Sequence, residues 1–163
     1  MKIGLNETQK AGITEYLFAL RCLLGSEGNL SLAIPFVDDE GVDLLVYRSK
    51  RGGKVLYIQV KSRFTLTGRG HYRSQVRKKS FLPRKDLYLA FVYYDASTNG
   101  LGKALWLIPT LDFINLVKRQ TSKRKFYIFH SKFTSQNDMW AKYRLSLEEL
   151  PKKMLNLVGK ADE

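Results

Sequence analysis

The chain has 163 residues, 44% of them hydrophobic, which suits one globular domain over residues 1–163 and excludes an intrinsically disordered chain. Its formal net charge is +13. A single cysteine, Cys22, excludes an internal disulfide and is typical of a reducing compartment. No apolar run approaches the ~20 residues that span a bilayer, and the first residues lack the apolar stretch of a signal peptide. We therefore expect a cytoplasmic protein without a membrane partner.

The positive charge is concentrated in two stretches that contain no acid. Thirteen Lys and Arg lie between Asp43 and Asp86, and a second acid-free stretch between Asp112 and Asp138 contains the run KRQTSKRK. A surface that serves only solubility intersperses both signs. The basic stretches do not form the amphipathic helix that an anionic membrane would bind. The charge therefore predicts a nucleic acid as partner.

The N-terminal part predicts a helix followed by a hairpin. Apolar residues recur at helical spacing over residues 7–28, whose C-terminal glycines can end the helix. Residues 30–41 indicate a short strand and a loop. Residues 42–48 and 54–64 indicate two strands, and the connecting SKRGG is a hairpin turn signal.

The remaining chain alternates between strands and helices. Residues 66–85 carry two glycines, a proline and much charge, and predict a loop with some helix. The later elements are strands over 87–95, 104–109, 125–133 and 139–145, a helix over 110–120 with Thr110 as its N-cap, and a helix over 146–159 that Pro151 kinks or delays. This order predicts one α/β domain around a sheet of about five strands.

Three polar residues converge in the predicted hairpin. Because strand side chains alternate between faces, Gln59 and Lys61 share one face while their apolar neighbours point to the core. Folding the chain about Gly52 places Asp43 opposite residues 59–61. We therefore expect a carboxylate, an amide and an ammonium group at one patch of the sheet.

Glu15 is a candidate fourth member of this patch. Its neighbours on the helix are small or apolar, so its carboxylate is costly there unless something pairs with it. The first helix of an α/β domain commonly packs on the sheet, where Glu15 would reach Asp43. Two alternatives stay open: Glu15 pairs with a surface cation, and Asp43 forms a structural salt bridge with Lys61.

The patch has the chemistry of a magnesium site. Mg²⁺ prefers oxygen ligands and binds through one or two carboxylates together with substrate phosphate. Asp43 offers a carboxylate, Gln59 an amide oxygen, Val60 a backbone carbonyl and Glu15 a second carboxylate that acts directly or through water. Lys61 would orient or deprotonate the attacking water, or stabilise the transition state.

These residues resemble the core of the PD-(D/E)xK nuclease superfamily. The match consists of Gly12 and Glu15 on the first helix, Pro35, Asp43, and the IQVKS segment around Lys61. The Gln-x-Lys form and the short chain most resemble the branch that contains a group I intron homing endonuclease. The resemblance implies a restriction-endonuclease-like mixed sheet flanked by helices and Mg²⁺- or Mn²⁺-dependent hydrolysis of DNA. It also implies a site made of Glu15, Asp43, Gln59 and Lys61.

The sequence departs from the family pattern at two places. Pro35 is not adjacent to Asp43, and Gln59 stands where the family has an acid two residues before the lysine. An amide binds a cation more weakly than a carboxylate does, which leaves open a one-metal mechanism or a weakened or lost activity.

Several functions share this signature. The leading hypothesis is a metal-dependent DNA endonuclease that acts on a specific duplex site, on a branched junction as Holliday junction resolvases do, or on a restriction target. The alternatives are a catalytically weakened or inactive nucleic-acid-binding protein on the same fold, and an RNA-processing nuclease. A symmetric DNA target needs two copies of the site, so we expect a homodimer or a higher homo-oligomer.

The candidate DNA-binding residues follow the proposed site in the chain. A segment that leaves Lys61 must emerge near the scissile phosphate, and the alternative is a solvated loop. The candidates are Arg63, Arg69, His71, Arg73, Arg77, Lys78 and Lys79.

Overall fold

The computed structural model describes residues 4–36, 41–49, 53–118, 120 and 125–159. Its helices are α1 (Glu7–Gly25), α2 (Thr110–Val117) and α3 (Leu150–Val158). The strands of the described residues are β1 (Leu30–Ala33), β2 (Leu44–Arg48), β3 (Leu56–Arg63), β4 (His71–Arg77), β5 (Leu87–Asp95), β6 (Gly100–Leu101), β7 (Ala104–Pro109), β8 (Phe126–Lys132) and β9 (Arg144–Ser146).

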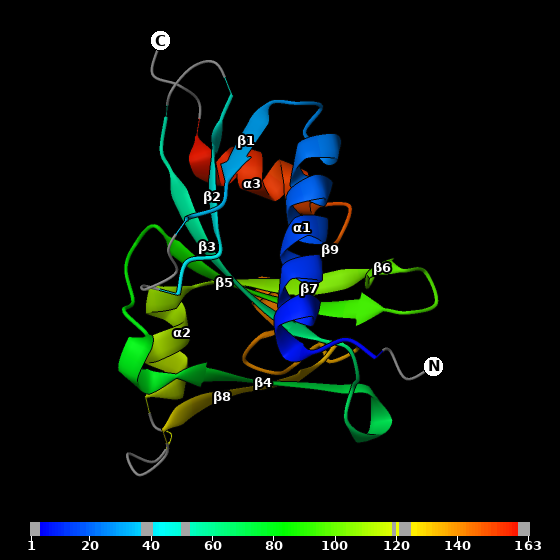
Figure 1. Cartoon of the computed structure of the whole chain (residues 1–163). Helices are drawn as coiled ribbons and strands as arrows, with labels where there is room; N and C mark the ends of the chain where they lie inside the picture. Colours follow the sequence, from blue (N-terminus) through cyan, green and yellow to red (C-terminus); the bar gives the residue numbers. More distant parts are fainter. Residues whose placement is uncertain (1–3, 37–40, 50–52, 119, 121–124, 160–163) are drawn as a thin grey trace.

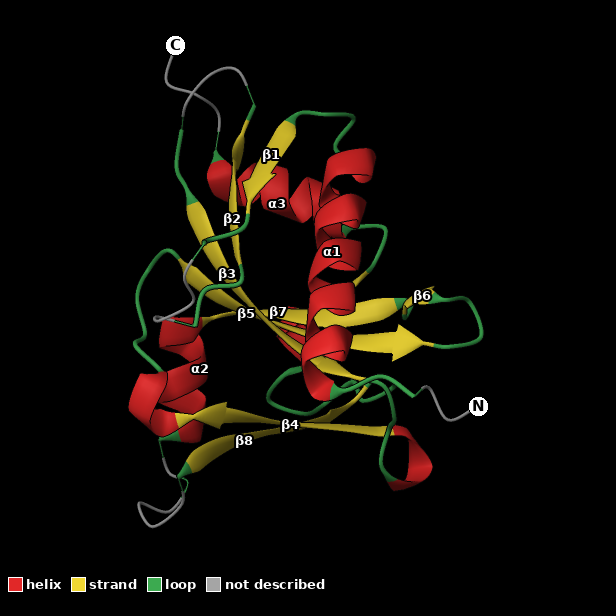
Figure 2. Ribbon diagram, viewed as in Figure 1, coloured by secondary structure: helices red, strands yellow, loops and turns green. Residues whose placement is uncertain are grey.

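A mixed central sheet organises the molecule (Figures 1 and 2). Its strand order is β1-β2-β3-β5-β7-β9, and β6 pairs with β5. β3 and β5 run parallel and the other neighbouring pairs run antiparallel. A separate antiparallel ribbon of β4 and β8 crosses below this sheet, next to α2. The predicted mixed α/β fold with flanking helices is confirmed, with more strands than the five expected.

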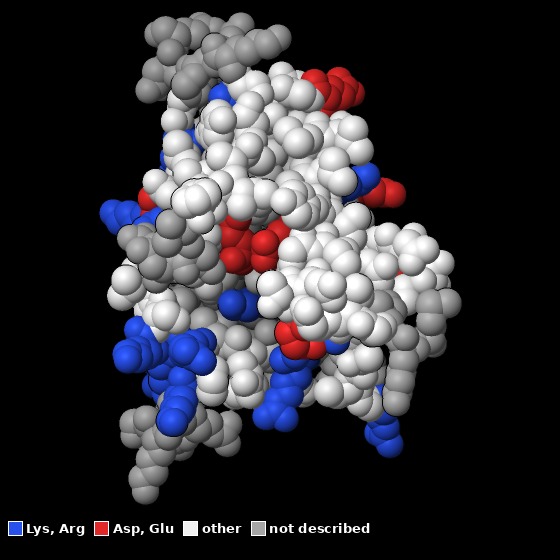
Figure 3. All heavy atoms as spheres, in the orientation of Figure 1, with Lys and Arg blue, Asp and Glu red and all other residues white. Residues whose placement is uncertain are grey.

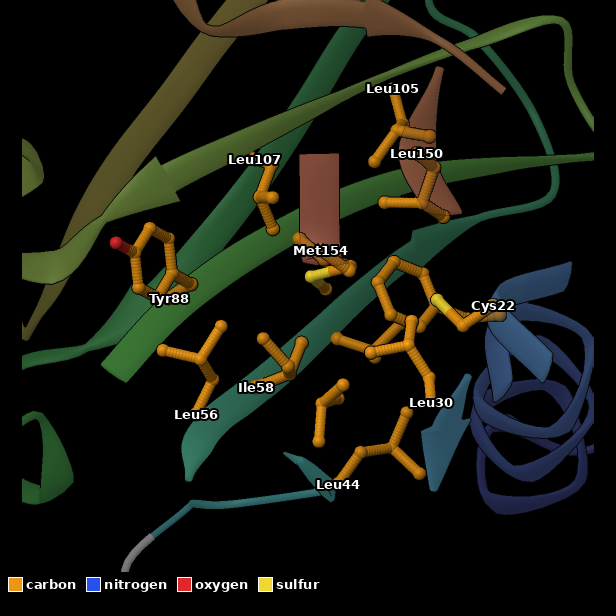
Figure 4. Packing of buried hydrophobic residues seen from close by; sticks show 14 of the residues in the cluster. Cys22, Leu30, Leu44, Leu56, Ile58, Tyr88, Leu105, Leu107, Leu150 and Met154 are labelled. Atoms are coloured by element: carbon orange, nitrogen blue, oxygen red, sulfur yellow. The ribbon is translucent and has the colours of Figure 1, made fainter. Parts of the chain in front are cut away.

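Apolar side chains cover both faces of the sheet. On one face, α1 and α3 bury a mostly aliphatic cluster that includes Leu44, Leu56 and Ile58 (Figure 4). Cys22 lies in this cluster, where burial raises the pKa of its thiol to about 12. On the other face, α2 and the β4–β8 ribbon bury an aromatic cluster that includes Trp106. β5 is therefore covered on both faces, as its continuous apolar sequence predicts.

The expectation of a loop with some helix over residues 66–85 is wrong. This segment contains β4, whose alternate residues are buried and exposed, with one-turn 3₁₀ helices at Gly68–Gly70 and Lys78–Ser80. β4 pairs with β8, where His71 faces Lys132 at one end and Arg77 faces Phe126 at the other. The strand depends on a partner about 55 residues further along the chain, so local turn signals do not reveal it.

Three other local expectations have different outcomes. Thr110 is the first residue of α2 rather than its N-cap, and its hydroxyl donates to the Arg84 carbonyl at 2.9 Å and accepts from the Arg84 N–H at 3.0 Å. The strand expected over 139–145 is a 3₁₀ turn followed by the short β9. Pro151 lies in the first turn of α3 and delays the start of this helix, as predicted.

No helix in the described residues is long and apolar enough to cross a membrane.

Candidate functional site

The hairpin of β2 and β3 fixes the position of Asp43. Its ladder ends at the pair of Leu44 and Ile58, directly after Asp43. The Asp43 N–H donates to the Ile58 carbonyl at 2.9 Å, and the Val60 N–H donates to Asp43 Oδ2 at 2.5 Å. Two strands therefore hold this carboxylate where the ladder ends. Gly52, the predicted centre of the turn, lies outside the described residues.

Gln59 and Lys61 lie on the face of β3 predicted from the alternation. Both side chains are half-buried, while Leu56, Ile58 and Val60 on the other face are buried. Parallel pairing places Gln59 next to Leu89, and Lys61 next to Phe91, on β5. β5 therefore pairs with β3 at both residues, whereas the ladder to β2 ends at Ile58.

The absence of a side chain at Gly41 allows the backbone to pack against the Gln59 amide. Gly41 has φ of +70°, a conformation that favours glycine, and a Cβ atom there would lie 2.3 Å from Gln59 Nε2. The backbone that enters β2 therefore packs directly on this amide. The contact restricts where the Gln59 side chain can place its carbonyl oxygen.

The backbone of Val60 contributes to the same edge. In an antiparallel ladder, the N–H and the carbonyl of one residue point to the same neighbouring strand. Because the Val60 N–H donates to Asp43, the Val60 carbonyl points to the edge on which this carboxylate lies. The structure therefore brings together three of the four predicted metal ligands, from Asp43, Gln59 and Val60.

Glu15 lies on the part of α1 that runs beside this region. At the start of the helix, the Lys10 ammonium lies 5.8 Å from the ring of Phe64, which directly follows β3. Further along its length, α1 packs against β3. Its side chain is half-buried on α1, and α1 packs on the sheet through Phe18.

The charge on this side of the molecule is arranged in zones (Figure 3). Acidic side chains gather in a central hollow beside α1, and Lys and Arg side chains border the hollow below. A structural salt bridge between Asp43 and Lys61 stays a prediction.

The metal would be held by few protein carboxylates. In the part of the chain that the structure describes, no group of three or more His, Cys, Asp or Glu side chains could hold a metal ion. The candidate ligand set contains two carboxylates, Asp43 and Glu15, with neutral oxygens beside them. Such a set fits Mg²⁺, which retains waters and takes ligands from substrate phosphate, and does not fit a closed zinc site.

The β4–β8 ribbon is tied to β3 by two hydrogen bonds. The buried Tyr72 hydroxyl donates to the Lys61 carbonyl at 2.5 Å, and Arg63 Nε donates to the Arg73 carbonyl at 2.6 Å. Desolvation in the core raises the pKa of the Tyr72 hydroxyl far above its ordinary value, so this hydroxyl remains a donor. The position of the ribbon relative to Lys61 is therefore fixed.

The predicted DNA-binding residues lie on this ribbon and its ends rather than on a loop. Arg73, Arg77 and Lys79 are exposed, and His71 and Lys78 are half-buried. The remaining two lie nearer the end of β3: Arg63 is half-buried, and Arg69 is exposed in the 3₁₀ turn, with φ of +59°.

Two cationic pockets flank the exposed residues of β4, which alternate with its buried residues. The first has a volume of about 350 Å³ and is lined by Arg63, Thr65, Thr67, Arg73 and Gln75. The second has a volume of about 630 Å³ and is lined by Arg77, Lys78, Lys79, Lys125 and Phe126. Cationic side chains line both pockets, which favours an anionic partner at this surface.

Sequence reasoning missed the contribution of β8 to this surface. β8 brings Lys132 opposite His71 and His130 opposite Arg73, and the rings of His71 and His130 stack at a centroid distance of 4.8 Å. The sequence does contain a signal for β4, because Tyr72, Ser74 and Val76 alternate with more polar residues. This alternation is difficult to recognise because Ser74 is itself polar and the residues between are mostly charged.

A third cavity lies away from the candidate site. It has a volume of about 410 Å³ between β7, β9 and α3, and it is lined in part by Tyr88, Tyr143 and Asp112. The Tyr143 hydroxyl donates to Asp112 Oδ2 at 3.0 Å. None of the predicted site residues lines this cavity.

Comparison with known proteins identifies a related fold. No protein-family model matches the chain, and no curated protein matches it. A solved structure, described as that of a bacterial homing endonuclease, I-Ssp6803I, aligns with a TM-score of 0.58 and 18% sequence identity. The alignment covers 91% of this chain and 93% of the other. The chain is therefore similar in fold, over nearly its whole length, to a bacterial homing endonuclease.

Proposed function

We propose that this chain is a metal-dependent DNA endonuclease of the PD-(D/E)xK type. The observation that carries the proposal is the Asp43 carboxylate, which accepts a hydrogen bond from the Val60 N–H on the strand that also bears Gln59 and Lys61. The basic ribbon beside this strand and the fold shared with a homing endonuclease support the same function. The substrate is DNA, and the ion is Mg²⁺ or Mn²⁺.

The residues of the proposed site would divide the chemistry among them. Asp43, Gln59 and the Val60 carbonyl would hold the cation, with Glu15 acting directly or through water. The bound cation would supply charge neutralisation at the scissile phosphate and a more acidic water. Lys61 would hold the attacking water in line or accept its proton, and its ammonium form would stabilise charge on the phosphate.

Cleavage of both strands of a duplex requires two copies of this single site. A symmetric assembly with one two-fold axis meets this requirement, and it matches a pseudo-palindromic target. We therefore include a homodimer, or a higher homo-oligomer, in the proposal.

The test is cleavage of DNA by the full chain with and without metal. Supercoiled plasmid and a four-way junction are incubated with Mg²⁺, with Mn²⁺ or with excess EDTA, and the products are separated on gels. We expect nicked or linear plasmid with either metal and none in EDTA. Cleavage that persists in EDTA would remove the metal mechanism. Binding without any cleavage would favour the inactive nucleic-acid-binding protein.

Gln59 tests the ligand assignment. Gln59→Glu keeps the shape of the side chain and adds a charge beside Asp43, so we expect cleavage at a lower Mg²⁺ concentration than the wild type needs. Gln59→Ala should raise the Mg²⁺ concentration for half-maximal cleavage by roughly 10-fold or more. The measurement is a Mg²⁺ titration of the plasmid cleavage rate, and unchanged titration curves for both variants would show that Gln59 is not a ligand.

A further inference from the structure

We infer that the outward face of the β4–β8 ribbon enters the major groove of duplex DNA and reads base pairs beside the cleavage site. The outward face consists of residues 71, 73, 75 and 77 of β4 and their partners on β8. The inference rests on the proposed function for the location of the cut. Beyond the proposed function, this inference assigns a role in sequence recognition to the uncharged Gln75 and to the strand β8.

The ribbon separates its two faces cleanly. Tyr72, Ser74 and Val76 are 0%, 4% and 1% exposed and pack toward the aromatic cluster, while Arg73, Gln75 and Arg77 are exposed. Neither strand contains an aspartate or a glutamate. On the outward face, β4 therefore presents a row of polar side chains that can donate hydrogen bonds, and neither strand has an acid to repel phosphate or base acceptors.

The dimensions of the ribbon suit the major groove. Two paired strands lie about 4.8 Å apart, and the B-DNA major groove, about 12 Å wide, admits a two-stranded ribbon. Arg73 and Arg77 are four residues apart, about 13 Å along the strand, and each lines one of the two cationic pockets. Phosphates on the two walls of the groove would therefore meet these two pockets while the residues between them face the bases.

The middle of the outward row carries side chains that read bases. Arg pairs in a bidentate manner with guanine, and Gln pairs in the same way with adenine. Gln75 lies between Arg73 and Arg77 and borders the first pocket, but it has no net charge, so it adds nothing to phosphate neutralisation. Its contribution would be discrimination between sequences, whereas the second pocket would contribute affinity for any sequence.

Insertion of the ribbon into the major groove requires duplex DNA rather than duplex RNA. The major groove of A-form RNA is deep and narrow, and protein elements do not reach its bases. The hydrogen bonds from Tyr72 to Lys61 and from Arg63 to Arg73 hold the ribbon at a fixed offset from the proposed site. The bases that the ribbon reads would therefore lie a fixed number of steps from the cut.

The experiment begins with a selection of duplexes from a randomised pool by the wild-type full chain. Affinity for the selected duplex and for a scrambled duplex is then measured by fluorescence anisotropy at several salt concentrations. Three variants are compared with the wild type: Gln75→Ala, the triple variant Arg77→Ala, Lys78→Ala, Lys79→Ala, and Asn156→Ala. Asn156 is an exposed amide on α3, on the opposite side of the sheet, and serves as the matched control.

We expect Gln75→Ala to lower the preference for the selected duplex by roughly 5- to 100-fold, with an unchanged salt slope. The triple variant should weaken binding to both duplexes alike and flatten the slope of log K against log salt by roughly 2 to 3. Asn156→Ala should change neither quantity. Unchanged thermal melting of Gln75→Ala would confirm that the loss is not an effect of folding.

The outcomes separate this inference from the proposed function. A wild-type chain that cleaves DNA but selects no consensus, or a Gln75→Ala variant that keeps the full preference, would overturn base reading and leave the endonuclease intact. Duplex RNA that competes as well as the selected DNA would also overturn it. A consensus that depends on Gln75 without any cleavage would support the ribbon and remove the proposed function.

Discussion

Asp43→Asn and Lys61→Ala are each expected to lower the rate of DNA cleavage by about 10³-fold or more, with DNA affinity retained. The asparagine can still accept the hydrogen bond that the Val60 N–H gives to Asp43, so the end of the β2–β3 ladder keeps its geometry. The variant loses only the charge that would hold the cation. Lys61→Ala removes the ammonium group next to Gln59 and leaves the backbone of β3 in place.

The measurement is single-turnover cleavage of plasmid with Mg²⁺, beside DNA binding in EDTA. Glu148→Gln and Lys152→Ala make the same changes of charge at exposed positions near the start of α3, and they should cleave at the wild-type rate. Full activity in either site variant would remove the proposed mechanism. Loss of binding together with cleavage would point to a folding defect, which circular dichroism would detect.

Phe129→Ala is expected to lower the free energy of unfolding by about 3 to 5 kcal/mol. Phe129 is fully buried, and its ring stacks on Phe91 of β5 with a centroid distance of 3.9 Å and an interplanar angle of 7°. It also packs against Trp106 and Trp140, at centroid distances of 5.2 Å and 5.0 Å. An alanine there would leave a cavity at the contact between the ribbon and the central sheet.

Urea denaturation of the full chain measures this loss. Phe36→Ala is the matched control, because Phe36 is fully exposed and the same substitution should cost no more than about 0.5 kcal/mol. A loss below about 1 kcal/mol in Phe129→Ala would show that the aromatic cluster does not anchor the ribbon.

The features that could be predicted from the sequence are those specified by neighbouring residues. β5 follows from an unbroken apolar run, and the hairpin of β2 and β3 from its turn and alternation. The helix α1 is present as predicted, but the apolar spacing did not identify its buried face: Thr14, Phe18 and Cys22 are buried, whereas Leu20 and Leu24 are exposed. The Asp43 carboxylate lies beside β3, where it accepts a hydrogen bond from the Val60 N–H, and the hairpin alone is sufficient to bring it there. The roles of these residues in catalysis remain predictions.

The features that escaped prediction depend on contacts between distant segments. β4 is stabilised by β8, and its charged outward residues resemble those of a solvated loop when the partner is unknown. Thr110 has the side chain of a good N-cap but bonds to the distant backbone of Arg84 instead. The stacking of His71 on His130 also requires the ribbon, because the two residues are diagonal neighbours across its strands.

The alternation of β4 has an evolutionary consequence. Tyr72, Ser74 and Val76 hold the ribbon on the sheet, and Tyr72 also bonds to the strand that carries Lys61. The residues that point outward take no part in this packing, and surface substitutions usually change stability by less than about 0.5 kcal/mol. Under the proposed function, descendants of this chain would acquire new DNA targets by exchanging alternate residues of one strand, while the scaffold and the proposed site are inherited unchanged.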